Sequence, residues 1–508
     1  MPLSREPNTT KNYTIWGGGF SGGLFNSING SLIPDNCLAD MSNLRIDHFG
    51  NLHSVPKPTQ STDCYASALS GSIRALIPTS LNMYVNRNGT MYNEANQGTT
   101  WTVDTNTTQV AESPIAGRQW VTDTDGLWSA GVNITEADED FADYAADCNS
   151  WTITEFEGRI VFNLGNLLRW SDLTDPALET TWRGPVDPVD GTTMTLANTL
   201  FFIKMRNLIR KLVRCRGNLY AFCDDGVYAA PTLDVVNGTG SIRPVYSGAY
   251  LPKFGTGAPF SLYSDGSIMY YVCNNKLIAF DGSNANLISD RLSLPSSLAW
   301  YAGEYDNRLW FLLCTEAQPD GAVANNLYSI DKTTGAWEKY SITRTSLNDS
   351  ATETPTAMSA GGDPVVGIRG DRLWIGTNLG RVYYFTPADT ATPMPWSFTT
   401  KTYTPSFDAY SRFVHFKIRY VGQPLTSAVT ITQHVCRDGV DATSDTILTR
   451  AAATLDMVGT GGGMFQKDIE CHADLGEGVY FTVSGTGTCE IADIGCEFTM
   501  KGAGDTNP

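Results

Sequence analysis

The sequence predicts an all-β protein: a β-propeller of six or seven blades followed by an antiparallel β-sandwich or barrel domain. One phrase recurs at intervals of roughly 40 to 60 residues, and repeats of that length indicate small sheets that must stack to bury both faces. Each copy has an apolar strand, a Gly, Asn or Asp turn, and a second strand rich in aromatic residues. The clearest copies are Phe156–Phe162, Arg216–Phe222, Ser264–Tyr270, Tyr305–Phe311 and Arg369–Ile375.

The composition agrees with a folded β protein that has many turns. Of the 508 residues, 42% are hydrophobic and 11% are aromatic, which suffices for a packed core and excludes a wholly disordered chain. Only 17% of the residues are charged, whereas glycine occurs 48 times. This combination is typical of sheets that are joined by many turns.

The net charge limits the classes of partner. With 35 basic and 53 acidic residues, the net charge is 35 − 53 = −18. Non-specific binding to nucleic acid depends on lysine and arginine at the phosphates, so we do not expect a protein that grips DNA in general. An electronegative wall could instead surround DNA and let it slide, and solubility alone is an equally simple explanation of the charge.

The cysteines and the chain start indicate a protein made in a reducing cytoplasm. Eleven scattered cysteines without a Cys-x-x-Cys pair favour buried free thiols over a disulfide framework. The first ten residues are polar and lack the regions of a signal peptide. No apolar run approaches the length that spans a membrane, so we expect no membrane insertion.

Residues 1–60 are expected to form an N-terminal arm and a following hairpin. The Gly-rich stretch 17–23 indicates an extended arm that becomes ordered only against a partner or its own body. Trp16 and Phe20 would anchor this arm, and we expect them to pack into a neighbouring subunit. Between residues 43 and 55, two short strands flank a glycine turn, which predicts a β-hairpin.

Residues 61–392 are expected to form the propeller. The stretch 232–257 is expected to be a connecting loop, and 203–214 is the best candidate for a short helix. Because the second block has the weakest pattern, six blades plus an irregular element is the alternative to seven blades. The seven strand-turn-strand blocks span 66–104, 110–145, 150–183, 207–231, 258–289, 296–341 and 357–387.

Two turns between strands support the propeller interpretation. Residues 96–101 keep the spacing of an Asp-x-Gly-x-Thr-Trp turn, with Asn96 in place of Asp, and residues 331–337 join two strands in the same manner. In such turns a side-chain oxygen accepts hydrogen bonds from turn amides, glycine adopts a positive φ, and tryptophan packs between sheets. Their expected role is to hold a blade together.

Residues 393–508 are expected to form the separate β-sandwich or barrel domain. Here the period lengthens, and apolar residues alternate with polar ones along the stretches 413–421, 429–432, 479–483 and 491–498. Such alternation indicates strands that have one buried face and one solvated face.

No pattern indicates an enzyme, a metal site or a cofactor. The chain has no Gly-x4-Gly-Lys-Ser/Thr loop. The five histidines, at positions 48, 53, 415, 434 and 472, show no metal-ligand spacing. A propeller glycoside hydrolase would need carboxylates or arginines that converge from several blades, and a single degenerate Asp-box turn is weak support for it. We therefore assign no catalytic residue and no metal ligand.

An acidic cluster lies in the second block. It lacks the spacing and the central glycine of an EF-hand, so a solvated acidic loop is the simplest interpretation. A calcium site and the electronegative lining of a channel are the alternatives. The cluster comprises Glu136, Asp138, Glu139, Asp140, Asp143 and Asp147.

A basic cluster stands out in a chain that is otherwise poor in cations. Helical spacing would align Arg206, Arg210 and Arg214 on one stripe. Pairing with acidic neighbours or with an adjacent subunit is the simplest interpretation, and contact with DNA phosphates in a pore is the sharper alternative. The segment lacks interleaved aromatic residues, which argues against recognition of single strands. The cluster comprises Lys204, Arg206, Arg210, Lys211, Arg214 and Arg216.

Several segments carry motifs of one known family. The N-terminal hairpin of that family leads into an Arg-Pro-Gly step, where this chain has Lys57-Pro58-Thr59. The family's most recognisable blade is similar to Cys215–Tyr228. Further matches are Pro34–Leu52 for the hairpin, Leu168–Pro176 with Trp182 for a strand end, Phe260–Gly282 for a blade, and Thr399–Lys401 with Lys417 for the start of the C-terminal sheet. In these segments the chain resembles the tail-nozzle and tail-hub proteins of bacteriophages.

The resemblance implies a structural virion protein of a tailed phage and no enzyme. It implies a homo-oligomeric ring, usually sixfold, that lies below the portal and its adaptor and contacts other tail proteins. The protein would be assembled in the host cytoplasm and located in the virion tail, where double-stranded DNA passes through the ring during ejection without tight binding. A receptor- or glycan-binding propeller module of the virion is the alternative function, ahead of a propeller glycoside hydrolase.

Overall fold

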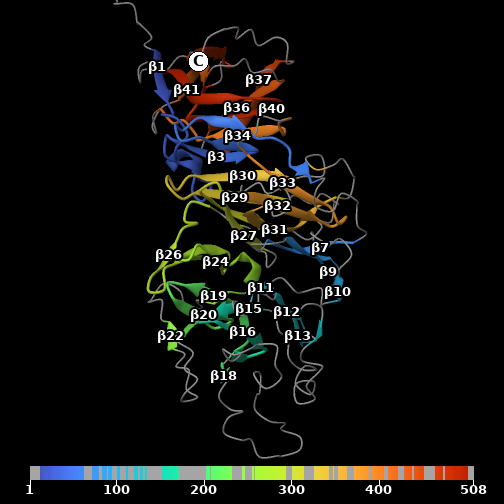
Figure 1. The fold of residues 1–508 in the computed structure, drawn as a ribbon. Coiled ribbons are helices and arrows are strands. Elements are labelled where there is room, and N and C mark those ends of the chain that lie inside the picture. The colour runs from blue at the N-terminus through green and yellow to red at the C-terminus, as the bar shows by residue number, and fades with distance from the viewer. Residues whose placement is uncertain are drawn as a thin grey trace, which may run out of the picture.

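The computed structural model is an elongated molecule built of β-strands (Figure 1). The described residues contain no α-helix, and short 3₁₀ turns such as η1 (Gly30–Leu32) and η5 (Pro259–Ser261) lie between strands. Accordingly, none of these residues forms a helix long and apolar enough to cross a membrane. The structure describes residues 12–61, 71–78, 83–87, 90–93, 100–102, 110–112, 119–123, 126–129, 132–133, 152–170, 202–205, 207–230, 243–245, 255–256, 258–292, 294, 300–313, 325–342, 347, 353–362, 371–387, 392–405, 410–421, 428–437, 440–450, 464–472 and 475–500.

The middle of the chain forms successive four-stranded antiparallel units, one for each predicted block. In every unit, strands that follow one another in sequence pair with one another. The first unit contains β7 (Ile73–Pro78), β8 (Met83–Arg87), β9 (Thr90–Asn93) and β10 (Thr100–Thr102), and the second contains β11 (Val110–Glu112), β12 (Gln119–Asp123), β13 (Gly126–Ser129) and β14 (Val132–Asn133). The third unit contains β15 (Ile153–Phe156), β16 (Arg159–Leu164), β17 (Leu167–Trp170) and β18 (Phe202–Lys204). The fourth unit contains β19 (Ile209–Cys215), β20 (Asn218–Cys223), β21 (Val227–Ala230) and β22 (Arg243–Val245).

The remaining units continue the same pattern. They contain β23 (Tyr263–Ser264), β24 (Met269–Cys273), β25 (Lys276–Phe280) and β26 (Ala285–Leu287); β27 (Trp300–Tyr305), β28 (Arg308–Leu313), β29 (Asn325–Asp331) and β30 (Trp337–Ile342); and β31 (Pro355–Gly362), β32 (Asp371–Thr377) and β33 (Val382–Phe385). A strand from the start of the chain completes the last unit, because β6 (Thr59–Gln60) pairs with β33.

Six pairs of neighbouring units contact each other through their first strands. β15 contacts β11 and β19, β23 contacts β19 and β27, and β31 contacts β27 and β7. Separate apolar clusters fill the spaces between units, with Phe222 and Tyr271 in one and Trp310 and Phe385 in another. The last unit therefore packs against the first, as well as against the unit before it.

Two larger sheets face each other at the end of the molecule that carries the C-terminal strands (Figure 1). Phe416 and Phe481 meet between them with ring centroids 4.4 Å apart, inside one apolar core. The strands are β1 (Asn12–Trp16), β2 (Gly23–Leu24), β3 (Cys37–Ser42), β4 (Leu44–Ile46), β5 (Leu52–Ser54), β34 (Trp396–Thr400), β35 (Ser411–Val421), β36 (Val429–Arg437), β37 (Val440–Arg450), β38 (Met464–Glu470), β39 (Leu475–Gly476), β40 (Gly478–Gly485) and β41 (Glu490–Met500).

The order of strands shows how these sheets are joined to the rest. One sheet runs β38-β35-β41-β5-β4, with β1 beside β41 and β39 beside β35. The other extends the unit β27–β30 through β2, β3, β34, β40, β36 and β37. Both are open sheets in the described part of the chain. The N-terminal hairpin β4–β5 is confirmed, and the C-terminal strands are not a separate body, because N-terminal strands lie in both sheets.

The N-terminal arm packs on its own chain, which corrects the expectation that it anchors in a neighbour. β1 pairs with β41 along its whole length, and β2 lies parallel to both β3 and β30. Phe20 is 1% exposed and lies in the core against Phe398. The guanidinium of Arg419 covers the ring of Trp16 at 3.5 Å. Phe20 is thus buried within its own chain, and Trp16 is half-buried there.

Two further expectations were wrong for a common reason. The segment 203–214 is not a helix, because 202–204 is the outer strand β18 and 209–215 is the first strand β19. The predicted loop 232–257 contains β22. The outer strands β18 and β22 have three residues each. Such short strands show no alternation of apolar and polar residues that sequence inspection could detect. The eight described cysteines are free, as predicted.

The position of β2 generates a testable prediction about Gly23. Its φ is +70°, and an added Cβ would lie 2.5 Å from the carbonyl O of Trp337. The Gly23→Ala variant should lose about 1 to 3 kcal/mol more unfolding free energy than a variant that has only the φ penalty, because backbone atoms must shift. Gly335→Ala is the matched control, since Gly335 also has φ +70° but open space around a Cβ. Urea unfolding measures both variants, and equal losses would contradict the prediction.

Candidate functional site

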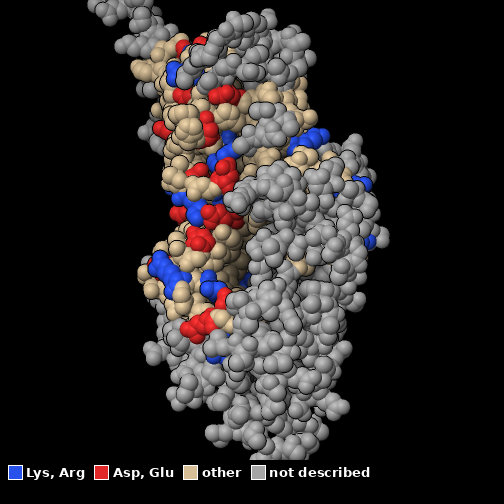
Figure 2. All heavy atoms as spheres, viewed as in Figure 1, with Lys and Arg blue, Asp and Glu red and all other residues tan. Residues whose placement is uncertain are grey.

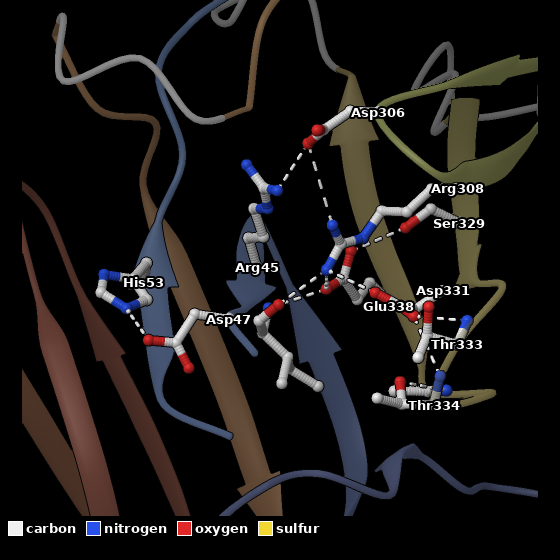
Figure 3. Close-up of polar contacts among 12 residues, drawn as sticks. Arg45, Asp47, His53, Asp306, Arg308, Ser329, Asp331, Thr333, Thr334 and Glu338 are labelled. Carbon is white, nitrogen blue, oxygen red and sulfur yellow. Dashed lines mark hydrogen bonds and ion pairs between the residues drawn. The ribbon is translucent and has the colours of Figure 1, made fainter. Parts of the chain in front are cut away.

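A fully buried carboxylate joins the N-terminal hairpin to the unit β27–β30 (Figure 3). Glu338 of β30 has no exposed surface. Its Oε1 accepts a hydrogen bond of 2.7 Å from the backbone N–H of Ile46 in β4, and its Oε2 accepts hydrogen bonds from the hydroxyls of Ser329 and Tyr340. Because a buried charge is costly unless it is hydrogen-bonded, these donors fix where the hairpin docks.

Arg308 of β28 balances this charge beneath the same hairpin. Its Nη2 donates a hydrogen bond of 2.7 Å to the carbonyl O of Ile46 and lies 3.3 Å from Oε1 of Glu338. Only 6% of its side chain is exposed. Burial acts to lower the pKa of Arg308, but Glu338 and the other nearby carboxylates outweigh burial and raise that pKa above its ordinary value. The guanidinium therefore stays charged inside the protein.

The strand register explains why these groups meet. Ser329 lies directly opposite Glu338 across β29 and β30, and Arg308 lies directly opposite Asp331 across β28 and β29. Residues opposite each other in adjacent strands share one face of the sheet. A second link lies nearby, since the amide of Asn43 donates to the carbonyl O of Pro395 at 2.7 Å and its Oδ1 accepts from a backbone N–H of β30 at 2.8 Å.

The turn after β29 has the predicted local mechanism. Oδ1 of Asp331 accepts hydrogen bonds of 2.8 and 3.0 Å from the backbone N–H groups two and three residues later. Gly335 has a φ of 70°, and Trp337 is 1% exposed in the core. The other predicted turn, at 96–101, falls mostly outside the described residues.

A polar groove of about 410 Å³ lies beside this junction, between β23 and the β27–β28 turn. Nζ of Lys332 lies in it, 3.0 Å from carboxylate oxygens of Glu304 and of Asp265. Asp306 lines the groove and pairs with Arg45 of the hairpin at 2.5 Å. Burial acts to raise the pKa of Asp265, but hydrogen bonds from backbone amides and Lys332 outweigh it and lower that pKa. The groove is therefore lined by ionised groups that are already paired.

Two arginines of the basic cluster are paired with carboxylates of the same chain. Arg210 makes a two-point contact with Asp224, at 2.7 and 3.1 Å. Arg214 pairs with Glu155, which lies in β15 of the neighbouring unit. This agrees with the simplest interpretation, pairing with acidic neighbours, and the strand geometry replaces the expected helical stripe.

The other cluster residues are placed as follows. Desolvation lowers the pKa of Lys211 to about 8. Arg216 is exposed in the turn after β19. Lys204 is the last residue of β18, and its backbone pairs with Leu167 of β17. Arg206 and the whole acidic cluster, residues 136–147, lie outside the described residues.

Exposed apolar side chains gather in the N-terminal segment. Among the described residues, seven large hydrophobic side chains are exposed, and four of them lie between residues 13 and 49. Phe49 at the tip of hairpin β4–β5 is 76% exposed, and Leu32 at the end of η1 is 66% exposed. Single exposed apolar groups are ordinary on protein surfaces, so only their concentration in this segment is notable.

A histidine and two carboxylates from distant segments meet beside the same hairpin. His53 Nε2 lies 3.0 Å from Oδ2 of Asp47 and 4.0 Å from Oε1 of Glu490. Burial acts to raise the pKa of Asp47, but hydrogen bonds from Asn51, His53 and Phe49 lower it. The spacing of the histidines in the sequence predicted no metal site. Spacing could not show that His53 lies beside Glu490, which is more than four hundred positions away.

Sequence analysis also missed Glu338 and Arg308. Each lies in a strand beside large apolar residues, so alternation places both on a definite face of the sheet. Whether that face is covered depends on hairpin β4–β5, which lies nearly three hundred residues earlier. A charged residue inside an otherwise apolar strand repeat is the signal that could have marked them.

No protein-family model matches the chain, and no curated protein matches it. Among solved structures, PorZ, a bacterial surface component of the type-IX secretion system of Porphyromonas gingivalis, is 11% identical with a TM-score of 0.36, covering 66% of this chain and 42% of its own. Hsv2 of Kluyvelomyces marxianus is 11% identical with a TM-score of 0.26, covering 54% of this chain and 97% of its own. This chain thus spans less than half the length of PorZ.

The buried junction predicts a large effect of removing its carboxylate. The Glu338→Ala variant should lose about 3 to 5 kcal/mol of unfolding free energy, because Arg308 and the Ile46 N–H would remain buried without their partner. Urea unfolding followed by tryptophan fluorescence measures the loss. Glu304→Ala is the control, since a partly exposed pair with Lys332 should contribute at most about 1 kcal/mol. Similar losses in the two variants would show that the buried junction does not carry the stability assigned to it.

Proposed function

We propose that this chain is a structural subunit of a bacteriophage tail, a nozzle, hub or tube protein that assembles into a ring around passing double-stranded DNA. The family resemblance of the sequence segments suggests this role, and the pairing of cations with carboxylates of the same chain is the observation that supports it best. In the proposal the ring is sixfold, lies below the portal and its adaptor, and has no catalytic activity.

Within this proposal, the seven four-stranded units are the blades of one β-propeller. The contacts between first strands of neighbouring units support this arrangement. So does β6, which comes before the first unit and completes the last one. Such an exchange would close the ring of blades with a strand from the other end of the domain, and it would cover a sheet edge that could otherwise aggregate.

The charge arrangement supports a passive conduit. Figure 2 shows acidic and basic side chains intermixed among the described residues of the visible face. Of the basic cluster, Arg210 and Arg214 are held by Asp224 and Glu155. A cation that is already paired gains little from a phosphate, so few counterions would be released on DNA binding. With a net charge of −18, the wall would repel the DNA backbone and let it move under pressure.

The exposed apolar groups of the N-terminal segment are the proposed contact between subunits. Trp16 and Phe20 are occupied within the chain, whereas Leu32 and Phe49 are exposed. In a ring these two side chains would be buried against the next subunit, which would contribute favourable free energy to assembly.

The first prediction of this proposal concerns DNA. The wild-type protein should bind duplex DNA weakly at physiological salt, as fluorescence anisotropy would measure. The double variant Asp224→Asn, Glu155→Gln frees two arginines, so it should bind more tightly, with a slope of log affinity against log salt that is steeper by about 1.8. Adding Arg210→Ala and Arg214→Ala should abolish that gain. Tight, salt-sensitive binding by the wild-type protein would rule out a passive wall.

The second prediction concerns assembly. The Leu32→Ser, Phe49→Ser variant should form fewer rings than the wild type while its midpoint of thermal unfolding stays the same, because both side chains are exposed in the single chain. Light scattering after size-exclusion chromatography measures the mass, and electron micrographs show rings. Leu208→Ser is the control, since Leu208 is 44% exposed just before β19, in a unit that no strand of the N-terminal segment joins. Undiminished ring formation by the double variant would refute this contact.

A further inference from the structure

The geometry of Asp47, His53 and Glu490 points to a metal site that ties the N-terminal hairpin to the C-terminal strand. We propose that these three side chains bind one Zn²⁺ ion. Their ligand atoms all lie within 4.8 Å of one another, and the imidazole Nε2 lies 3.0 Å from Oδ2 of Asp47 and 4.0 Å from Oε1 of Glu490. The proposal does not depend on the tail function suggested above.

The backbone holds each ligand in place before any ion binds. Glu490 of β41 lies directly opposite His53 of β5, so their side chains share a face of the sheet. Oδ1 of Asp47 accepts hydrogen bonds of 2.8 Å from the backbone N–H groups of Phe49 and Asn51, which orients its other oxygen toward His53. Figure 3 shows His53 and Asp47 directed toward each other.

The residue types select the class of ion. One imidazole nitrogen with two carboxylate oxygens suits a borderline ion such as Zn²⁺, which binds both donor types at about 2.0 to 2.2 Å, with water at the fourth position. Ca²⁺ and Mg²⁺ prefer oxygen ligands alone, so they should compete poorly. Small side-chain movements would bring the three ligand atoms from their present separations to the distances around a shared ion.

The charge and access of the site agree with an ion from solution. The three side chains are 33%, 21% and 31% exposed for His53, Asp47 and Glu490, so they are reachable. Arg45 lies opposite His53 on the other side, but its guanidinium pairs with Asp306. Two carboxylates beside one imidazole therefore make a site that attracts a cation.

A second histidine in the same sheet provides a contrast. Nδ1 of His415 lies 3.2 Å from Oε2 of Glu497, but Nζ of Lys417 lies 2.8 Å from the same oxygen. The ammonium occupies the place that an ion would take. His415 is therefore the matched control for His53.

Binding would have a structural consequence. β5 and β41 pair through only two residues, at His53 and Leu52. A shared ion would add a link between hairpin β4–β5 and the C-terminal sheet, and binding to the folded state alone would raise its stability.

The test is calorimetric titration of the full chain with Zn²⁺ after treatment with a chelator. We expect one site whose affinity falls at least about tenfold in Glu490→Gln and in His53→Ala, since even outer partners of a metal change affinity by that amount. His415→Ala should bind as the wild type does. Zn²⁺ should raise the midpoint of thermal unfolding of the wild type and leave that of Glu490→Gln unchanged. Circular dichroism of each chelated variant confirms that it is folded.

Three outcomes would overturn the proposal. The first is that the wild type does not bind Zn²⁺. The second is that the wild type and the folded Glu490→Gln variant bind Zn²⁺ with equal affinity. The third is that His415→Ala loses as much Zn²⁺ affinity as Glu490→Gln does. Co²⁺ separates this site from cysteine thiolates, because nitrogen and oxygen ligands give no thiolate-to-cobalt charge-transfer band. A strong band of that kind on the tightest site would assign it to cysteine and also refute the proposal.

Discussion

The structure depends on the need to satisfy one buried charge. Glu338 is fully enclosed, so its carboxylate must receive hydrogen bonds from inside the protein. Its donors come from β29, β30, Arg308 of β28, and the backbone of β4. Only one docking position of hairpin β4–β5 supplies the Ile46 N–H. The position of the hairpin then sets the edge on which β41 pairs, so one ionised group aligns the repeated units with the C-terminal sheets.

The N-terminal segment connects both ends of the fold. Within about fifty residues it contributes β1 to the edge of β41, β2 and β3 to the join between two sheets, and β6 to the last repeated unit. Each contribution is short, and each closes a sheet edge or fills a gap between sheets. An edge with a partner in the same chain cannot pair with another molecule. In the proposed ring, exposed side chains of this segment such as Leu32 and Phe49 would contact the next subunit.

Charged side chains, like the strands of the N-terminal segment, find partners within the same chain. Several described cations lie next to carboxylates, as Lys332 does in the groove and Arg45 does at Asp306. Exposed pairs of this kind contribute little stability. Their larger effect is to remove free positive charge from an already acidic protein, which is the property that a wall around moving DNA would need. The Asp47–His53–Glu490 group differs, because there the carboxylates outnumber the cations.

The sequence by itself determined the all-β class, the seven repeated blocks, the hairpin near residue 45 and the Asp331 turn, because each depends on alternation or turn chemistry within about ten residues. The tertiary structure decided the rest. The strands β18 and β22 are too short to show a pattern, and they exist because a neighbouring strand pairs with them. The arm lies on its own chain because β41, almost five hundred residues later, offers an edge. Glu338 with Ile46, and His53 with Glu490, meet only after distant strands align, and no local rule encodes such pairings.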